Sequence, residues 1–103
     1  MNPEISIIIP AYNEENRITP TLIDLDHFLK NKGWCYEVVV VDDGSIDNTS
    51  ALIKKLAEQL DHLRLITLPE NRGKGHAVQK GMLEASGNIR VMFDADGYVS
   101  PEQ

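Results

Sequence analysis

The sequence predicts an α/β, Rossmann-like fold in which a βαβαβαβ series forms a parallel sheet with helices on both faces. Two observations predict it. Short β-branched runs alternate with segments whose apolar residues recur at helical spacing, and Tyr36–Val41 is apolar almost throughout, which is typical of a strand buried on both faces. The length, 103 residues, fits a single unit spanning residues 1–103.

The strands and helices follow one another in a regular order. The first helix is expected to begin with Thr19 as its N-cap and Pro20 in its first helical position, and to end at Gly33. The second is expected over residues 49–60, and the third ends before Gly87. Gly81 lies inside the third helix, where glycine costs about 1 kcal/mol relative to alanine, so close packing against the sheet is expected there. The expected strands are Glu4–Pro10, Tyr36–Val41, Leu63–Leu68 and Ile89–Phe93.

Charge and composition limit the partners. Ten Lys and Arg residues stand against 16 Asp and Glu residues, a formal charge of −6, which argues against nucleic acid or an anionic membrane surface as a partner. No apolar run has the length of a membrane span, and no secretory signal is recognisable. The one cysteine, Cys35, cannot form an intrachain disulfide. We therefore expect the protein in the cytoplasm, or at the cytoplasmic face of a membrane in a longer protein.

Polar clusters follow all four expected strands. They are Tyr12–Glu15, Asp42–Asp43, Arg72–Lys74 and Asp94–Asp96. Each cluster alone is compatible with an ordinary turn or a solvated loop. Because ligands of open parallel sheets bind outside the carboxyl ends of the strands, the four clusters together predict one binding site.

Asp94 and Asp96 form the most informative pair. Two carboxylates one residue apart at a strand end repel each other unless a cation lies between them. Mg²⁺ and Mn²⁺ accept such ligands and complete their shells with substrate phosphates. A metal held by Asp94 and Asp96 would let an acidic protein bind a diphosphate, with Arg72 or Lys74 supplying further positive charge. Nearby, the Tyr12 ring can stack on a planar base.

Three functions are compatible with these residues. The first is binding of a nucleotide diphosphate through a metal. The second is a haloacid-dehalogenase-like phosphatase that uses Asp94 and Asp96 as nucleophile and acid/base, although its motif normally follows the first strand and here follows the fourth. The third is a non-catalytic nucleotide-binding or interaction module.

Four segments resemble, in order and spacing, the family 2 inverting glycosyltransferases, and most closely their dolichyl-phosphate glucosyltransferase branch. The resemblance covers essentially the whole chain. The segments are Ile9–Glu15, Val41–Ser45, Asn71–Gly75 and Asp94–Gly97.

The resemblance implies the N-terminal, nucleotide-binding half of a GT-A domain. Pro10, Tyr12 and Glu14 would line the base and ribose pocket, and Asp43, or its neighbour Asp42, would contact the nucleoside. Arg72 and Lys74 would approach the nucleotide. Asp94 and Asp96 would form the D-x-D motif that contacts Mg²⁺ or Mn²⁺ and the diphosphate. Some relatives have a further polar ligand two residues after the second aspartate, where this chain has Tyr98.

The implied reaction is displacement at the anomeric carbon with inversion, from a UDP- or GDP-hexose donor to a polyprenyl phosphate or saccharide acceptor. A carboxylate base deprotonates the acceptor hydroxyl. The base and the acceptor site are expected beyond Gln103, so the chain is interpreted as a domain truncated after the D-x-D motif. Residues Arg90–Asp94 would then form an exposed sheet edge, which predicts self-association.

Overall fold

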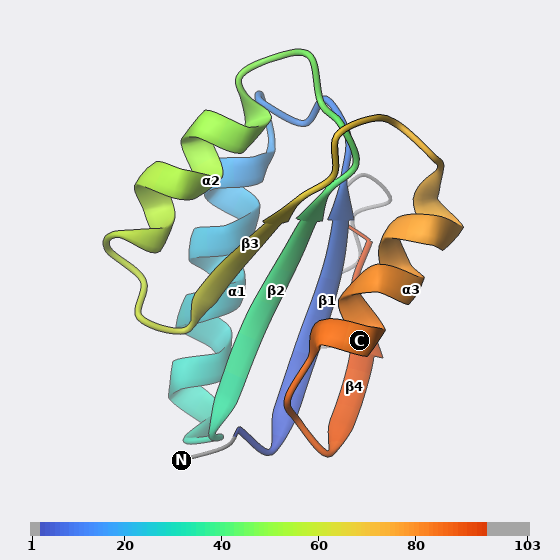
Figure 1. Ribbon diagram of the computed structural model, residues 1–103. Coiled ribbons are helices and arrows are strands. Elements are labelled where there is room, and N and C mark those ends of the chain that lie inside the picture. Colours follow the sequence, from blue (N-terminus) through green and yellow to red (C-terminus); the bar gives the residue numbers. More distant parts are fainter. Residues whose placement is uncertain (1–2, 95–103) are drawn as a thin grey trace.

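The structure, a computed structural model, describes residues 3–94 and contains one four-stranded parallel sheet (Figure 1). The strand order is β3-β2-β1-β4, so β1 and β2 are central and β4 lies at one edge. The predicted α/β class and βαβαβαβ order are confirmed. In chain order the elements are β1 (Ile5–Ala11), α1 (Ile18–Lys32), β2 (Tyr36–Asp42), α2 (Thr49–Ala57), β3 (Leu63–Thr67), α3 (Lys74–Glu84) and β4 (Ile89–Met92).

The helices form two layers, as Figure 1 shows: α1 and α2 cover one face of the sheet and α3 covers the other. Alternate residues of β2 serve the two layers. Val38 and Val40 pack in the larger cluster with α1 and α2, whereas Val39 and Val41 pack with Ala77 of α3. This burial on both faces explains why Tyr36–Asp42 is mostly apolar instead of alternating between polar and apolar residues, as the sequence pattern predicted.

The first helix begins earlier than expected. The main-chain N–H groups of Arg17 and Ile18 both donate to the Glu14 carbonyl, and the resulting turn leads directly into α1. Arg17 is the N-cap residue and makes no side-chain capping bond, so the prediction that Thr19 caps this helix was wrong. The end of the helix is as predicted: Gly33 adopts φ 70°, and its N–H donates to the Lys30 carbonyl.

Several other boundaries differ by one to three residues, those of β1, β2 and β3 included, and one packing prediction is confirmed. Helix α2 ends at Ala57 instead of Leu60, and β4 ends at Met92 instead of Phe93. A Cβ atom on Gly81 would come within 2.6 Å of Cγ2 of Ile8, so α3 approaches β1 as closely as the glycine predicted.

A buried carboxylate fastens the end of α3 to the sheet. Glu37 accepts hydrogen bonds from the Ser6 hydroxyl at 2.6 Å, the Ser86 N–H at 2.7 Å and the Arg64 guanidinium at 3.1 Å. Burial raises the pKa of Glu37, but these hydrogen bonds and the positive charge of Arg64 outweigh it and hold the pKa below its ordinary value. Arg64 also donates to the Glu84 carbonyl at the carboxyl end of α3. This arrangement holds α3 in place at the end of the sheet opposite the pocket described below.

Candidate functional site

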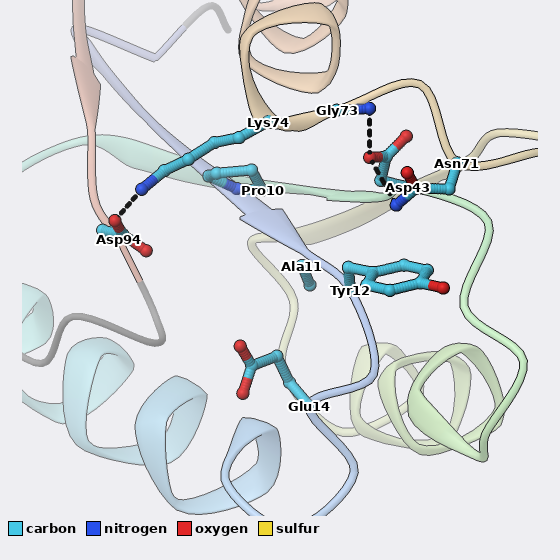
Figure 2. Close-up of a pocket in the computed structure, with 9 residues that line it drawn as sticks. All are labelled: Pro10, Ala11, Tyr12, Glu14, Asp43, Asn71, Gly73, Lys74 and Asp94. Atoms are coloured by element: carbon cyan, nitrogen blue, oxygen red, sulfur yellow. Dashed lines mark hydrogen bonds and ion pairs between the residues drawn. The ribbon is translucent and has the colours of Figure 1, made fainter.

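A pocket opens where the loops leave the carboxyl ends of the strands (Figure 2). It is the place at which an open parallel sheet binds its ligands. The predicted site residues that line it are Pro10, Tyr12, Glu14, Asp43, Lys74 and Asp94. The convergence expected from four separate sequence clusters is therefore present in the structure.

The turn after β1 presents an aromatic ring and a carboxylate to the pocket. Tyr12 is 42% exposed, whereas Glu14 is 5% exposed. The carboxylate of Glu14 forms an ion pair with Arg17 at 2.6 Å. Between Tyr12 and Glu14, Asn13 adopts φ 53°, a left-handed conformation that asparagine tolerates better than most residues. Its neighbours Tyr12 and Glu14 both line the pocket.

The turn after β1 is bonded to the turn after β2. The N–H of Asn13 donates to the Ser45 hydroxyl at 2.9 Å, and its side-chain oxygen accepts the Ile46 N–H at 3.0 Å. The N–H of Glu14 donates to the hydroxyl of Thr49, a fully buried residue, at 2.8 Å. These long-range bonds, more than 30 residues apart in sequence, fix the pocket wall that carries Tyr12 and Glu14.

Asp47 strengthens the same junction. Its carboxylate accepts the Thr49 N–H at 2.9 Å and the Glu15 N–H at 3.3 Å, and it also accepts the Thr49 hydroxyl. Desolvation raises the pKa of Asp47, but the hydrogen bonds from Thr49 and Glu15 outweigh it and keep the pKa below its ordinary value. Asp47 thus stays ionised as an acceptor for the start of α2.

Asp43 holds the loop between β3 and α3. Its carboxylate accepts the Asn71 side-chain amide at 3.1 Å, the Arg72 N–H at 3.0 Å and the Gly73 N–H at 2.9 Å. Gly44 allows the two loops to approach, because a Cβ atom there would lie 2.5 Å from the Glu70 carbonyl carbon. Asp43 is only 3% exposed, so its first task in the structure is to place the start of α3 at the pocket.

Lys74 and Asp94 form an ion pair across the pocket. Lys74 is the first residue of α3, and Asp94 lies just after β4. Figure 2 shows the Lys74 side chain extending past Pro10 to the Asp94 carboxylate. The side chains retain 50% and 26% of their exposure, so both can be reached from solvent. The polar clusters that follow β3 and β4 thus meet in one place.

Two predicted site residues are placed differently, and a third is not described. Asp42 is 1% exposed, does not line the pocket, and accepts the Ser45 N–H at 3.1 Å. The guanidinium of Arg72 also lies outside the lining and pairs with Glu70 at 2.8 Å, while only its main-chain N–H turns towards Asp43. Asp96 lies outside the described residues.

The pocket also contains residues that the sequence did not single out as ligand contacts. They are Ala11, Asn71 and Gly73. Asn71 and Gly73 belong to the stretch Asn71–Gly75, one of the four segments that carry the family resemblance, from which only Arg72 and Lys74 were named as contacts. The Gly73 contact with Asp43 leaves no signature in residue type, because any residue can donate a main-chain N–H. The Asn71 contact uses its side-chain amide, so the residue type was the available signal there.

The donor set is compatible with a hard divalent cation. Among residues 3–94, no three His, Cys, Asp or Glu side chains are grouped so as to hold a metal ion alone. Mg²⁺ is commonly bound through one or two carboxylates together with substrate phosphates. Asp94 offers one such carboxylate in the pocket, beside the Lys74 ammonium. The pocket therefore combines an aromatic ring, buried carboxylates and the Lys74–Asp94 ion pair.

Comparison with known proteins identifies the family. The model of glycosyl transferase family 2 matches residues 6–103. The chain belongs to glycosyl transferase family 2. The family resemblance based on the four motifs is thereby confirmed.

Curated relatives agree with the narrower placement in that family. The dolichyl-phosphate beta-glucosyltransferase of Dictyostelium discoideum is 41% identical over 103 residues, which covers 93% of this chain and 32% of that protein. The human dolichyl-phosphate beta-glucosyltransferase is 41% identical over 102 residues, covering 91% and 31%. The chain therefore spans about a third of the length of these relatives.

Solved structures share the fold. A mannosyltransferase from Pyrobaculum calidifontis, in complex with GDP-Man and Mn²⁺, superimposes with a TM-score of 0.79 at 35% identity, covering 93% of this chain and 28% of that one. S. aureus TarS 1-349 in complex with UDP-GlcNAc gives a TM-score of 0.76 at 34% identity, covering 93% and 27%. Both neighbours were thus solved with a nucleotide-sugar, and the mannosyltransferase also with Mn²⁺.

The family assignment bears on one of the alternatives left open by the residues. The chain belongs to glycosyl transferase family 2 and not to the haloacid-dehalogenase-like phosphatases. Within residues 3–94, no helix is both long and apolar enough to cross a membrane.

Proposed function

We propose that this chain binds a nucleotide-diphosphate sugar through Mg²⁺ or Mn²⁺, as the donor-site part of an inverting glycosyltransferase. The enzyme would transfer a hexose to a polyprenyl phosphate such as dolichyl phosphate, or to another acceptor. The observation that carries the proposal is that Tyr12, Asp43, Lys74 and Asp94 line the same pocket at the carboxyl ends of the strands. The names of the curated relatives support the glucosyl donor and the dolichyl-phosphate acceptor.

Each pocket residue has a task in donor binding. The half-exposed Tyr12 ring offers a flat surface for the nucleobase. Asp43 holds the start of α3, and the amino-terminal end of a helix favours an anion. Asp94 would hold the metal, with Asp96 as the second predicted ligand. When bound, the metal would neutralise the charge that develops on the departing diphosphate.

Calorimetric titration tests this proposal. The folded chain is titrated with UDP-glucose, GDP-mannose, UDP and GDP, each with and without Mn²⁺. We expect binding that depends on Mn²⁺ and is abolished in Asp94→Asn, a change that keeps the size of the side chain but removes its charge. Asp24→Asn, at an exposed position of α1, is the matched control and should bind as the wild type does. A folded wild-type chain that binds none of these nucleotides in the presence of Mn²⁺ refutes the proposal.

We also propose that the isolated chain self-associates through the edge of the sheet. Strand β4 pairs only with β1 among the described strands, and it exposes Ile89, Val91 and Met92 to 58%, 45% and 44%. Ile89 and Val91 border an apolar groove that continues to Phe28 and Trp34 of the α1 layer. A second copy can pair with this edge and cover the groove at the same time, since open edges of this kind readily add a strand.

Sedimentation velocity at roughly 50 µM, where a micromolar dimer would be well populated, measures this association. The wild type is expected to sediment as a dimer or a larger species, and Val91→Asp, with a charge on the edge, as a monomer. Leu83→Asp is the matched control, because Leu83 is an exposed apolar residue of α3 at 74% exposure and does not line the groove. A monomeric wild type, or equal association in both variants, contradicts the proposal.

A further inference from the structure

The ion pair between Lys74 and Asp94 lies inside the candidate donor pocket. Both residues line this pocket, and the ammonium contacts the carboxylate directly (Figure 2). The two residues are 20 positions apart, so the contact depends on the fold and not on a local turn. The Lys74 ammonium thus occupies the Asp94 carboxylate, which is the candidate metal ligand among the described residues.

A lysine is suited to occupy such a carboxylate reversibly. Its ammonium is a compact charge on a flexible four-carbon stem, and it makes no fixed bidentate pair of the kind arginine forms. The pair is partly exposed, at 50% for Lys74 and 26% for Asp94, so a competing ion can reach it and water can solvate the ammonium that leaves. A divalent ion carries twice the charge of the ammonium and therefore competes well for the same oxygen atoms.

The backbone of Lys74 stays fixed at the pocket when its ammonium group moves. Lys74 is the first residue of α3, directly after Gly73, whose N–H is held by Asp43. The amino-terminal end of a helix favours an anion through its dipole. An ammonium released from Asp94 is therefore already positioned next to the place where a phosphate would lie.

We propose that Lys74 is an exchangeable counter-ion: it neutralises Asp94 until a divalent cation takes the carboxylate, and the released ammonium then binds the donor's diphosphate. This inference rests on the proposed function. It assigns the positive charge near the phosphates to Lys74, while the Arg72 guanidinium pairs with Glu70 outside the pocket. It also requires that the metal and the nucleotide respond in opposite directions to loss of the Lys74 charge.

The first measurement titrates Mn²⁺ alone into the wild type and into Lys74→Met, which keeps the apolar stem. Removing the competing ammonium is expected to tighten Mn²⁺ binding about fivefold, the scale of one partly exposed ion pair. Lys80→Met is the matched control, because Lys80 lies on the same helix and pairs with Glu84 at 3.6 Å, outside the pocket. Unchanged or weaker Mn²⁺ binding by Lys74→Met overturns the inference.

The second measurement titrates UDP, or GDP where the wild type prefers it, in saturating Mn²⁺. Lys74→Met is expected to bind the diphosphate about tenfold more weakly, as loss of one charge-assisted contact predicts, and Lys80→Met as tightly as the wild type. Equal nucleotide affinity in Lys74→Met overturns the role assigned to the released ammonium. A wild type that binds neither Mn²⁺ nor nucleotide refutes the proposed function instead, so the two failures are distinguishable.

A measurement on the wild type avoids dependence on the folding of a variant. The side-chain NMR signals of the lysines are followed as Mg²⁺ is added. The signal of Lys74 is expected to shift as its ammonium leaves Asp94, while that of Lys80 stays constant. A Lys74 signal that does not move at Mg²⁺ concentrations that saturate the protein overturns the inference.

Discussion

Replacing Gly81 by alanine tests the close contact between α3 and the sheet. The added Cβ atom would lie 2.6 Å from Cγ2 of Ile8, 3.0 Å from Cγ2 of Val41 and 3.3 Å from Cγ1 of Ile8. Both neighbours are fully buried, and both methyl groups sit on β-branched side chains with little freedom to turn away. Either the helix or the sheet must therefore move.

Two opposing effects set the size of the change. Alanine in a helix interior is favoured over glycine by about 1 kcal/mol. Forcing an additional methyl group into a packed interior costs about 1–3 kcal/mol. The net expectation for Gly81→Ala is a loss of about 1 kcal/mol in the free energy of unfolding. Gly75→Ala is the matched control on the same helix, since a Cβ atom at Gly75 meets nothing within 4 Å.

Urea denaturation followed by circular dichroism measures both variants against the wild type. Gly81→Ala is expected to unfold at a midpoint roughly 0.5–1 M lower. Gly75→Ala is expected to unfold at the same or a slightly higher midpoint, because alanine reduces the freedom of the unfolded chain by about 0.5 kcal/mol. If Gly81→Ala is as stable as Gly75→Ala, the close helix–sheet contact does not explain the glycine, and the packing argument fails.

Two further predictions concern buried polar groups. Glu37→Gln should lower the free energy of unfolding at pH 7 by about 2 kcal/mol, because the charge that faces Arg64 and the Ser86 N–H is lost. The folded pKa of Glu37 lies below its unfolded value. Its contribution to the free energy of unfolding is therefore complete above the unfolded pKa and disappears as the pH falls through the folded pKa. A stability difference between wild type and Glu37→Gln, measured in urea, that persists undiminished in acid would contradict this. Thr49→Val should cost about 2 kcal/mol by leaving the Glu14 N–H without its acceptor. The main-chain amide proton of Glu14 should then exchange faster with solvent. An unchanged exchange rate would show that the Thr49 hydroxyl is not its acceptor.

Much of the fold was predictable from local patterns in the sequence. The apolar run Tyr36–Val41 and the helical spacing of the other segments gave the element order, and Gly33 marked the end of the first helix correctly. The start of that helix was predicted wrongly from Thr19 and Pro20. A main-chain carbonyl, that of Glu14, accepts the first helical N–H groups instead, and main-chain acceptors are the same in every residue type.

The candidate site was predictable in position but not in detail. Parallel strands place their carboxyl ends at one edge, so clusters after four strands had to meet there, and the pocket confirms that they do. The orientation of single side chains depended on contacts between loops. Asp42 turns to the Ser45 N–H, and the Arg72 guanidinium turns to Glu70, although both have the charge expected of a ligand contact.

Sequence alone was therefore enough to predict the fold class, the family and the edge of the sheet at which the candidate residues gather, because these follow from periodicity, residue type and chain order. The partners of the charged groups emerged only in three dimensions. Asp43 holding residues 71–73, and Lys74 pairing with Asp94, join loops that are 20 or more residues apart in the chain. The reason is physical: a hydrogen bond or ion pair is set by distance and direction in space, and those are properties of the packed sheet and helices.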